Sequence, residues 1–216
     1  MSELVEQIKS AILGFEEEKL VEVVKESLEK NVSPLEIINA LTGALEEVGR
    51  KFEEGEIFLV HLVMAGETTK KVVSEYLEPL LKKSGTERKT LGRVVIGTVA
   101  GDIHDIGKNI VAALLFSAGF DVIDLGKDVP VEKFIEAVKK HNPDILGMSA
   151  LLSTTLPVQK EVIEALKKNN LRDKVKVIVG GAPVTAEWAQ QIGADGYAED
   201  AVEAVRVAKS LIQVEK

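Results

Sequence analysis

Apolar residues in the first 82 positions recur every three or four places, which is the spacing of one face of an α-helix. Two short apolar stripes, within residues 4–12 and 20–28, predict the first two helices. Ser33, Pro34 and Glu36 are typical of the start of a third helix, because they can act as N-cap, first-turn proline and capping-box partner. These segments indicate amphipathic helices that pack against one another.

A fourth helix is expected from about Ile57, with an apolar stripe that continues to Leu80, and Pro79 should kink or end it. Four such helices with short connections predict a small antiparallel four-helix bundle over residues 1–84. The polar stretch 82–90 contains one glycine and forms the natural linker to a second domain, which we place at residues 91–216.

Strand and helix patterns alternate five times in this second domain. Near-continuous apolar runs such as residues 94–99 are typical of strands that are buried on both faces. The alternation predicts an α/β fold in which a doubly wound, five-stranded parallel sheet carries helices on both faces, in a flavodoxin-like (Rossmann-type) order. The expected strands centre on Val95, Val122, Ile145, Val177 and residues 195–197, and the expected helices on Val111, Ile135, Ile163, Ala189 and Val205.

Composition excludes several classes of protein. None of the 216 residues is a cysteine, which removes disulfides, iron–sulfur clusters and thiolate metal sites. The net charge is −8 and no basic patch is present, which argues against a nucleic-acid partner. There is no apolar run of membrane-spanning length and no secretory leader, so we expect a soluble, cytoplasmic protein with no membrane partner.

Candidate chemistry gathers in residues 101–109, Gly-Asp-Ile-His-Asp-Ile-Gly-Lys-Asn, which connect the first strand of the second domain to its first helix. In open α/β sheets, ligands bind beyond the carboxyl ends of the strands, where such a loop lies. The segment is not a P-loop, because five residues separate its glycines and no Ser or Thr follows the lysine. A hydrolytic metal site using His104 and Asp105 would need three or four convergent ligands. A solvated loop histidine is the third alternative, and the residue types alone leave the last two open.

The order Asp102-x-His104-x-x-Gly107 at the end of a buried strand resembles the signature of cobalamin-binding domains of the methionine synthase type. The resemblance implies that His104 is the lower axial ligand of cobalt, in place of the cofactor's own benzimidazole. It also implies that Asp102 bonds the other ring nitrogen, which fixes the tautomer and raises the basicity of the ligand. Gly107 would let the backbone turn tightly beneath the macrocycle. The other cofactor-binding positions of this loop would be Gly101, Ile103, Asp105 and Ile106.

Two later loops resemble the slot that holds the displaced nucleotide tail of the cofactor in that family. They are residues 149–155, which are rich in hydroxyls, and residues 180–183, which begin with a glycine pair. Taken alone, the hydroxyls could simply cap a helix and the glycines could simply form a turn. The resemblance also implies a chain of proton-relay candidates, Asp102, His104 and Thr155, although the family usually has serine at the last position. The residues implied to line the slot are Ser149, Leu151, Ser153, Thr155, Gly180, Gly181 and Ala201.

The helical domain resembles the cap of the same family, in which apolar residues cover the upper, methyl-bearing face of the corrin. The segment 52–62 carries the match, and the implied cap residues are Phe52, Leu59 and Leu62. Apolar residues at this spacing also form the ordinary core of a helix bundle. The motif in the second domain favours the cap. His61, in the same segment, is expected to be a solvated helix residue.

The resemblance runs from about residue 4 to residue 212 and is closest to the stand-alone corrinoid proteins of methyltransferase systems for methanol, methylamines or methoxylated aromatics. It implies a methyl carrier that holds cobalamin, as methylcobalamin or cob(I)alamin, in a base-off, His-on state. Its partners would be a donor-specific methyltransferase, an acceptor methyltransferase acting on tetrahydrofolate or coenzyme M, and a reductive activation protein. The chain would be an accessory subunit, because substrate activation belongs to the partners.

Two alternatives use the same cofactor. A cobalamin-dependent sensor or regulatory protein would need an output element, and the acidic first 89 residues resemble the cap instead. The cobalamin subunit of a radical mutase shares the Asp-x-His-x-x-Gly motif but lacks the four-helix cap. Methionine synthase itself is excluded, because 216 residues leave no room for its homocysteine, folate and activation modules.

Overall fold

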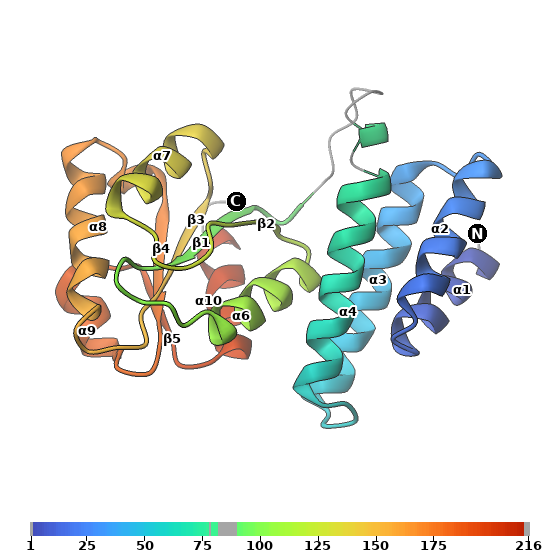
Figure 1. Ribbon diagram of the computed structural model, residues 1–216, viewed down its shortest axis with the longest axis horizontal. Coiled ribbons are helices and arrows are strands. Elements are labelled where there is room, and N and C mark those ends of the chain that lie inside the picture. The colour runs from blue at the N-terminus through green and yellow to red at the C-terminus, as the bar shows by residue number, and fades with distance from the viewer. Residues whose placement is uncertain (1, 78, 82–89, 214–216) are drawn as a thin grey trace. The chain divides into compact units, whose positions relative to one another are not determined.

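The computed structural model describes residues 2–77, 79–81 and 90–213 (Figure 1). The chain divides into two compact units: residues 1–89 together with residues 116–119, and residues 90–115 together with 120–216. Each unit is described by itself. The predicted linker, residues 82–90, lies outside the described residues except for Thr90.

The first unit is helical, as its apolar periodicity predicts. Ser33 caps the third helix in a capping box, in which the Glu36 amide donates to the Ser33 hydroxyl and the Ser33 amide donates to the Glu36 carboxylate at 3.1 Å. Its interior is built from the predicted stripes, with Ile8, Leu20 and Leu41 at 1% exposure or less. The helices are α1 (Ser2–Leu13), α2 (Glu17–Glu29), α3 (Pro34–Glu53) and α4 (Leu59–Val72).

The end of α4 differs from the prediction. The helix passes into a π-helical turn, Val73–Leu77, and residues 79–81 are helical again, so Pro79 does not end it. A π turn accommodates more residues than an α turn, which moves the buried face by one position. Leu80, which the stripe predicts to be buried, is therefore exposed, and Leu81 is buried instead. Pro79 is tolerated because its missing N–H follows a turn where the regular hydrogen-bond ladder is already interrupted.

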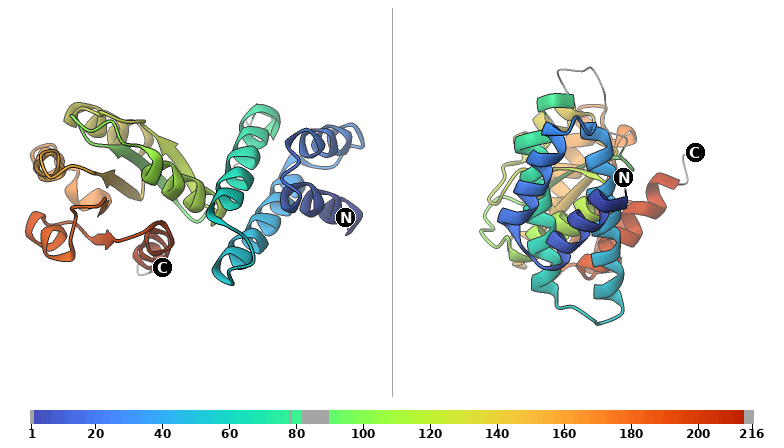
Figure 2. Two further views of the ribbon diagram at one scale, coloured as in Figure 1. Left: turned by 60° about the horizontal axis from the view of Figure 1, so that its bottom comes forward. Right: turned by 90° about the vertical axis from the view of Figure 1, so that its right-hand side faces the viewer.

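The second unit is a five-stranded parallel sheet with strand order β2-β1-β3-β4-β5, which confirms the predicted flavodoxin-like order. Helices α6 and α10 lie on one face, and α7, α8 and α9 on the other (Figures 1 and 2). The strands are β1 (Arg93–Thr98), β2 (Asp121–Asp124), β3 (Ile145–Ser149), β4 (Lys176–Gly180) and β5 (Gly196–Ala198). The helices are α6 (Ile106–Ser117), α7 (Val131–His141), α8 (Leu156–Lys168), α9 (Ala186–Ile192) and α10 (Ala201–Gln213).

The predicted centres fall within these elements, with two small differences. Ile145 begins β3 rather than centring it, and Asp195 comes just before β5. A hydrophobic core lies between the sheet and α7, α8 and α9, and includes Val95, Phe134, Leu146, Ile163 and Val177. Burial of each such side chain contributes about 1.5–3 kcal/mol, which gives the loops a rigid base.

The sheet order creates a switch point at the carboxyl ends of β1 and β3. These strands are neighbours, and the chain leaves β1 toward β2 on one side while β3 leads to β4 on the other. Loops that diverge in this way open a crevice where ligands bind in open α/β sheets. Among the described residues, no helix is both long and apolar enough to cross a membrane.

Candidate functional site

The loop from β1 to α6 holds an aspartate and a histidine in contact. Asp102 is fully buried, whereas the His104 side chain is 47% exposed. The Asp102 Oδ1 lies 2.7 Å from the His104 Nδ1 and also accepts the His104 backbone N–H at 3.1 Å. Thr98, at the end of β1, donates its hydroxyl to the His104 carbonyl at 3.0 Å. The backbone N–H and the backbone carbonyl of His104 are therefore both hydrogen-bonded, and the ring is held through Nδ1.

The second oxygen of Asp102 joins this loop to the one after β3. Its Oδ2 accepts the backbone N–H groups of Leu151 at 2.7 Å and Leu152 at 3.1 Å. The Thr155 hydroxyl lies 2.9 Å from this oxygen and 2.9 Å from the Leu152 carbonyl. The Thr155 hydroxyl has only one proton to donate. It donates this proton to the Asp102 carboxylate, because a charged acceptor forms the stronger hydrogen bond. One buried carboxylate thus fastens together the two loops of the switch point.

These contacts keep Asp102 ionised. Burial raises the pKa of its carboxyl group, but the hydrogen bonds from the His104 amide and ring, the Leu151 amide and the Thr155 hydroxyl lower it by more, so the pKa lies well below its ordinary value. An ionised carboxylate can only accept, so His104 carries its proton on Nδ1. In the neutral form of the ring, Nε2 then presents a lone pair, as a metal ligand requires.

The glycine pair Gly180 and Gly181, at the end of β4, marks a close approach of two strand ends. The Ala150 amide donates to the Gly180 carbonyl at 3.1 Å, and Gly181 has a φ of +121°. A Cβ atom on Gly181 would lie 1.9 Å from the Ala150 carbonyl oxygen, so only glycine fits there. The predicted slot residues Ser149, Gly180 and Gly181 are thus brought together at the ends of β3 and β4.

The other predicted site residues differ in how far they are exposed within their own units. Ser153 is exposed, and Ala201 is half-buried at the start of α10. In the helical unit, Leu62 is fully buried, Phe52 is half-buried and Leu59 is exposed.

Beside Leu59, three further apolar side chains are exposed: Phe58, Val60 and Met64. His61, expected to be a solvated helix residue, is half-buried: its ring stacks on Phe15 at 4.7 Å and its Nδ1 accepts the Phe58 amide at 3.1 Å.

Sequence reasoning missed one buried residue that bonds to the ends of β3 and β4, where the slot is predicted. Gln159 in α8 is fully buried, and its amide donates to the carbonyls of Met148 at 3.1 Å and Gly180 at 3.3 Å. Its oxygen accepts the indole N–H of Trp188 at 3.0 Å. The available signal was a polar residue on the apolar stripe of a helix, because such a residue must find partners when buried.

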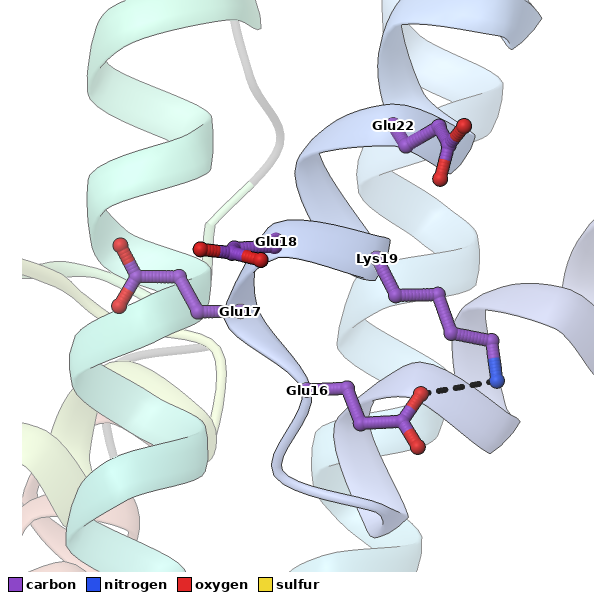
Figure 3. A pocket seen from close by; sticks show the side chains of 5 residues that line it. All are labelled: Glu16, Glu17, Glu18, Lys19 and Glu22. Atoms are coloured by element: carbon purple, nitrogen blue, oxygen red, sulfur yellow. Dashed lines mark ion pairs between the residues drawn. The ribbon is translucent and has the colours of Figure 1, made fainter.

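A separate hollow in the helical unit is lined by Glu16, Glu17, Glu18, Lys19 and Glu22 (Figure 3). Lys19 pairs with Glu16 at 2.8 Å, and Glu17 pairs with Lys71 of α4. Acidic residues in the first turn of α2 are favourable there because of the helix dipole. None of the predicted site residues lines this hollow, so we do not assign it to the candidate site.

Comparison with known proteins identifies the family. Two models described as B12 binding domain match the chain, one over residues 92–206 and one over residues 4–76. The chain belongs to the B12-binding domain family. The resemblance carried by the Asp-x-His-x-x-Gly motif is confirmed, and the cofactor of this family member is cobalamin.

Relatives of this B12-binding protein match it along nearly its whole length. It is 44% identical to trimethylamine corrinoid protein 1 of Methanosarcina acetivorans, over 97% of each chain. It is 48% identical to the dimethylamine corrinoid protein of Methanosarcina barkeri, over 97% of this chain and 98% of the relative. A chain of the methanol:cobalamin methyltransferase complex MtaBC from Methanosarcina barkeri has a TM-score of 0.88 and 37% identity, covering 98% of this chain and 80% of the other.

The residues of this B12-binding protein fit the cofactor. Around the exposed His104 ring, the two loops expose the large apolar side chains of Ile103, Ile106, Leu151 and Leu152. Exposed apolar surface of this extent is typical of a ligand contact, and a corrin is broad and largely apolar. The described residues contain no group of three or more His, Asp or Glu side chains placed to hold a metal ion. Cobalamin needs no such group, because its macrocycle already holds the cobalt and the protein has to supply a single imidazole ligand.

Proposed function

We propose that this protein is a corrinoid methyl carrier that works with a methyltransferase partner. The observation that carries the proposal is the exposed His104 ring, oriented by the buried Asp102 carboxylate at the switch point of the sheet. The full-length similarity to methylamine corrinoid proteins supports it, as does the similarity to a chain of a methanol:cobalamin methyltransferase complex. The same similarity favours a carrier over a cobalamin sensor or the subunit of a radical mutase.

His104 would bind cobalt through Nε2, since Nδ1 is occupied by Asp102. When bound, cobalamin supplies a cobalt centre that can accept and release a methyl group. The other residues of this segment, Gly101 to Gly107, of which Ile106 and Gly107 begin α6, would lie beneath the corrin. The tail of the cofactor would enter the slot between the ends of β3 and β4, lined by Ser149, Leu151, Ser153, Thr155, Gly180 and Gly181, with Ala201 near its end.

Proton storage would fall to the hydrogen-bonded chain of His104, Asp102 and Thr155. When the ring is not on a metal, its Nε2 is free to take up a proton. A carboxylate 2.7 Å from Nδ1 can keep its hydrogen bond to that ring whether or not Nε2 carries a proton. The Thr155 hydroxyl donates to the same carboxylate and limits how far it can rotate away.

The helical unit, residues 1–84, would serve as a cap, with residues 91–216 as the cobalamin-binding domain. Leu59 is suited to an apolar lid because it is exposed at the start of α4 beside Phe58 and Val60. Phe52 would contribute from the end of α3. Leu62 has no exposed surface, so it would support the lid by packing in the interior of the helical unit. Such a lid must open for transfer, since it also blocks access to the methyl group.

The methyl donor would be a methylamine or methanol, in keeping with the relatives and the similar complex. A donor-specific methyltransferase would load the carrier, and an acceptor methyltransferase would pass the methyl group to tetrahydrofolate or coenzyme M. A reductive activation protein would restore the reduced cofactor after oxidation.

The test is a methyl-loading assay with separate donor enzymes. The protein, reconstituted with reduced cobalamin, is mixed with a methanol-, dimethylamine- or trimethylamine-specific methyltransferase and its substrate, and methylation is followed by absorbance. We expect one donor enzyme to methylate the bound cofactor at least tenfold faster than free cobalamin. Rates equal to those with free cobalamin for every donor would contradict the carrier function.

A further inference from the structure

The connection between β2 and α7 contains an aspartate in an unusual backbone conformation. Asp128 has a φ of +53°, in the left-handed region. For a residue other than glycine this conformation costs about 1–2 kcal/mol, and asparagine and aspartate tolerate it best. Such strain persists only where surrounding contacts over-determine the conformation. The contacts of Asp128 therefore show which part of the structure depends on this conformation.

Two hydrogen bonds of Asp128 go to the loop between β1 and α6, which carries His104. The Asp128 Oδ1 accepts the backbone N–H of Gly101 at 2.7 Å. The backbone N–H of Asp128 donates to the carbonyl of Asp102 at 3.0 Å. The two bonds fix the peptide groups on either side of the Gly101–Asp102 pair. Asp128 thus fixes the backbone of Asp102, and the Asp102 carboxylate orients the His104 ring.

The segment around Asp128 is itself held in register beside β1. The Thr98 amide donates to the Gly126 carbonyl at 3.0 Å, and the Val129 amide donates to the Thr98 carbonyl at 3.0 Å. Val99 and Val129 form an isolated parallel bridge. Asp128 therefore acts from an extension of the sheet, and a residue placed on a rigid element positions its partners more accurately than one on a free loop.

The geometry points to Asp128 as a positioning residue for His104, acting through the backbone of Asp102. The inference rests on the proposed function in one respect, the role of His104 as the cobalt ligand. Loss of the Asp128 side chain should let the Gly101–Asp102 backbone move, so that the Asp102 carboxylate no longer stays 2.7 Å from Nδ1. The ring would then lose its single tautomer, and Nε2 would carry the proton in part of the molecules.

Three variants separate this role from simpler effects. Asp128→Gly removes the carboxylate but accepts the left-handed backbone without strain. Asp128→Asn keeps an acceptor oxygen and also tolerates that backbone, so it should behave as the wild type. Lys127→Met is the control, because it removes only the neighbouring half-exposed pair with Asp105 at 3.7 Å, an interaction of little strength.

The first measurement uses the protein without cofactor. Nuclear magnetic resonance of the ¹⁵N-labelled His104 ring, at a pH where it is neutral, reports which nitrogen carries the proton. We expect the proton on Nδ1 in the wild type, Asp128→Asn and Lys127→Met, and a mixture of tautomers in Asp128→Gly. A folded Asp128→Gly protein with the wild-type tautomer would overturn the inference. If that variant does not fold, hydrogen exchange in the wild type decides: the Gly101 amide must be protected, and free exchange there would overturn the inference equally.

The second measurement uses cobalamin. Changes in residues that support a metal ligand lower affinity by about 10–100-fold, and Asp128 acts one contact further away, so we expect roughly a tenfold loss in Asp128→Gly and none in the other two variants. Equal affinities in all four proteins would contradict the positioning role. A wild type that binds cobalamin without a histidine ligand would refute the proposed function instead, and the tautomer measurement would still stand on its own.

Discussion

Replacement of Asp102 by asparagine should have a larger effect than loss of one charge. An asparagine has one acceptor oxygen, whereas both oxygens of Asp102 accept. If the amide oxygen keeps the Leu151, Leu152 and Thr155 donors, the NH₂ group must face His104. It then opposes the His104 backbone N–H, and it can bond Nδ1 only if the ring proton moves to Nε2. Asp102→Asn should therefore block the metal-binding nitrogen.

The magnitude follows from the bonds involved. Hydrogen bonds to a charged group are worth about 1.5–3 kcal/mol each. Asp102→Asn loses the bond from the His104 amide and weakens those from the other donors, so we expect a loss of about 2–4 kcal/mol in the free energy of unfolding. Cobalamin affinity should fall by about 10–100-fold, which corresponds to roughly 1.4–2.7 kcal/mol.

The assays are urea unfolding of the cofactor-free protein and cobalamin titration. Asp105→Asn is the matched control for the unfolding assay, since the same change is made beside His104 at a residue whose ion pair, with Lys127 at 3.7 Å, is half-exposed. The wild type is the reference for the cobalamin titration. Asp105→Asn should lower the free energy of unfolding by less than about 1 kcal/mol. If Asp102→Asn is as stable as Asp105→Asn, or if it binds cobalamin as tightly as the wild type does, the reasoning about the buried carboxylate is wrong.

The stability difference should also depend on pH. Hydrogen bonds hold the pKa of Asp102 in the folded protein below its value in the unfolded chain, which is about 3.9. A depressed folded pKa contributes stability that is fully present above the unfolded pKa and is lost as pH falls toward the folded pKa. The advantage of the wild type over Asp102→Asn should therefore be constant near neutrality and shrink below about pH 4. A difference that stays constant down to pH 2 would contradict this assignment.

Three further predictions concern the slot and the helical unit. Gly181→Ala should lower the unfolding free energy by more than about 2 kcal/mol, since its Cβ would lie 1.9 Å from the Ala150 carbonyl oxygen and its φ is +121°; urea unfolding tests this, and a neutral change would contradict the close approach. Gln159→Leu should lower stability by about 1–3 kcal/mol and shift the emission of Trp188, the single tryptophan, because the indole loses its acceptor and two carbonyls each lose one donor; unchanged emission would refute that contact. Leu62→Ala should cost about 2–5 kcal/mol as a core residue, whereas Leu59→Ala should cost under about 1 kcal/mol and speed the photolysis of bound methylcobalamin; equal effects on both readouts would contradict their different placement.

Local periodicity was sufficient to predict the helical unit, because it shows which residues face a core. The strand order was predicted instead from the alternation of strand and helix patterns, which is typical of a doubly wound parallel sheet. It failed at Val73–Leu77, where the π turn lies within an apolar stretch. Val72 and Val73 are both buried, so spacing alone does not reveal the extra residue of the wider turn. The same limit applies to Leu59 and Leu62, since an apolar stripe does not distinguish an exposed residue from a buried one.

The candidate site was predictable where a residue's role depends on its neighbours in sequence. Asp102 and His104 are two positions apart, and the motif predicts their contact, which the structure has at 2.7 Å. Asp128 and Gln159 were missed because their partners are brought to them only by the fold, 27 residues away for the Asp128–Gly101 contact and 21 for the Gln159–Gly180 contact. The left-handed backbone of Asp128 leaves no mark in the sequence beyond a residue type that tolerates it.

The role of His104 as the cobalt ligand is tested most directly by electron paramagnetic resonance of the protein loaded with cobalt(II) cobalamin. The unpaired electron couples to the axial nitrogen, so the splitting reports which nitrogen is bound. With ¹⁵N-labelled histidine the splitting should change from the ¹⁴N to the ¹⁵N pattern, and His104→Ala should abolish the change while His61 and His141 remain. A splitting that ignores the label, or a labelled splitting that persists in His104→Ala, would contradict the assignment.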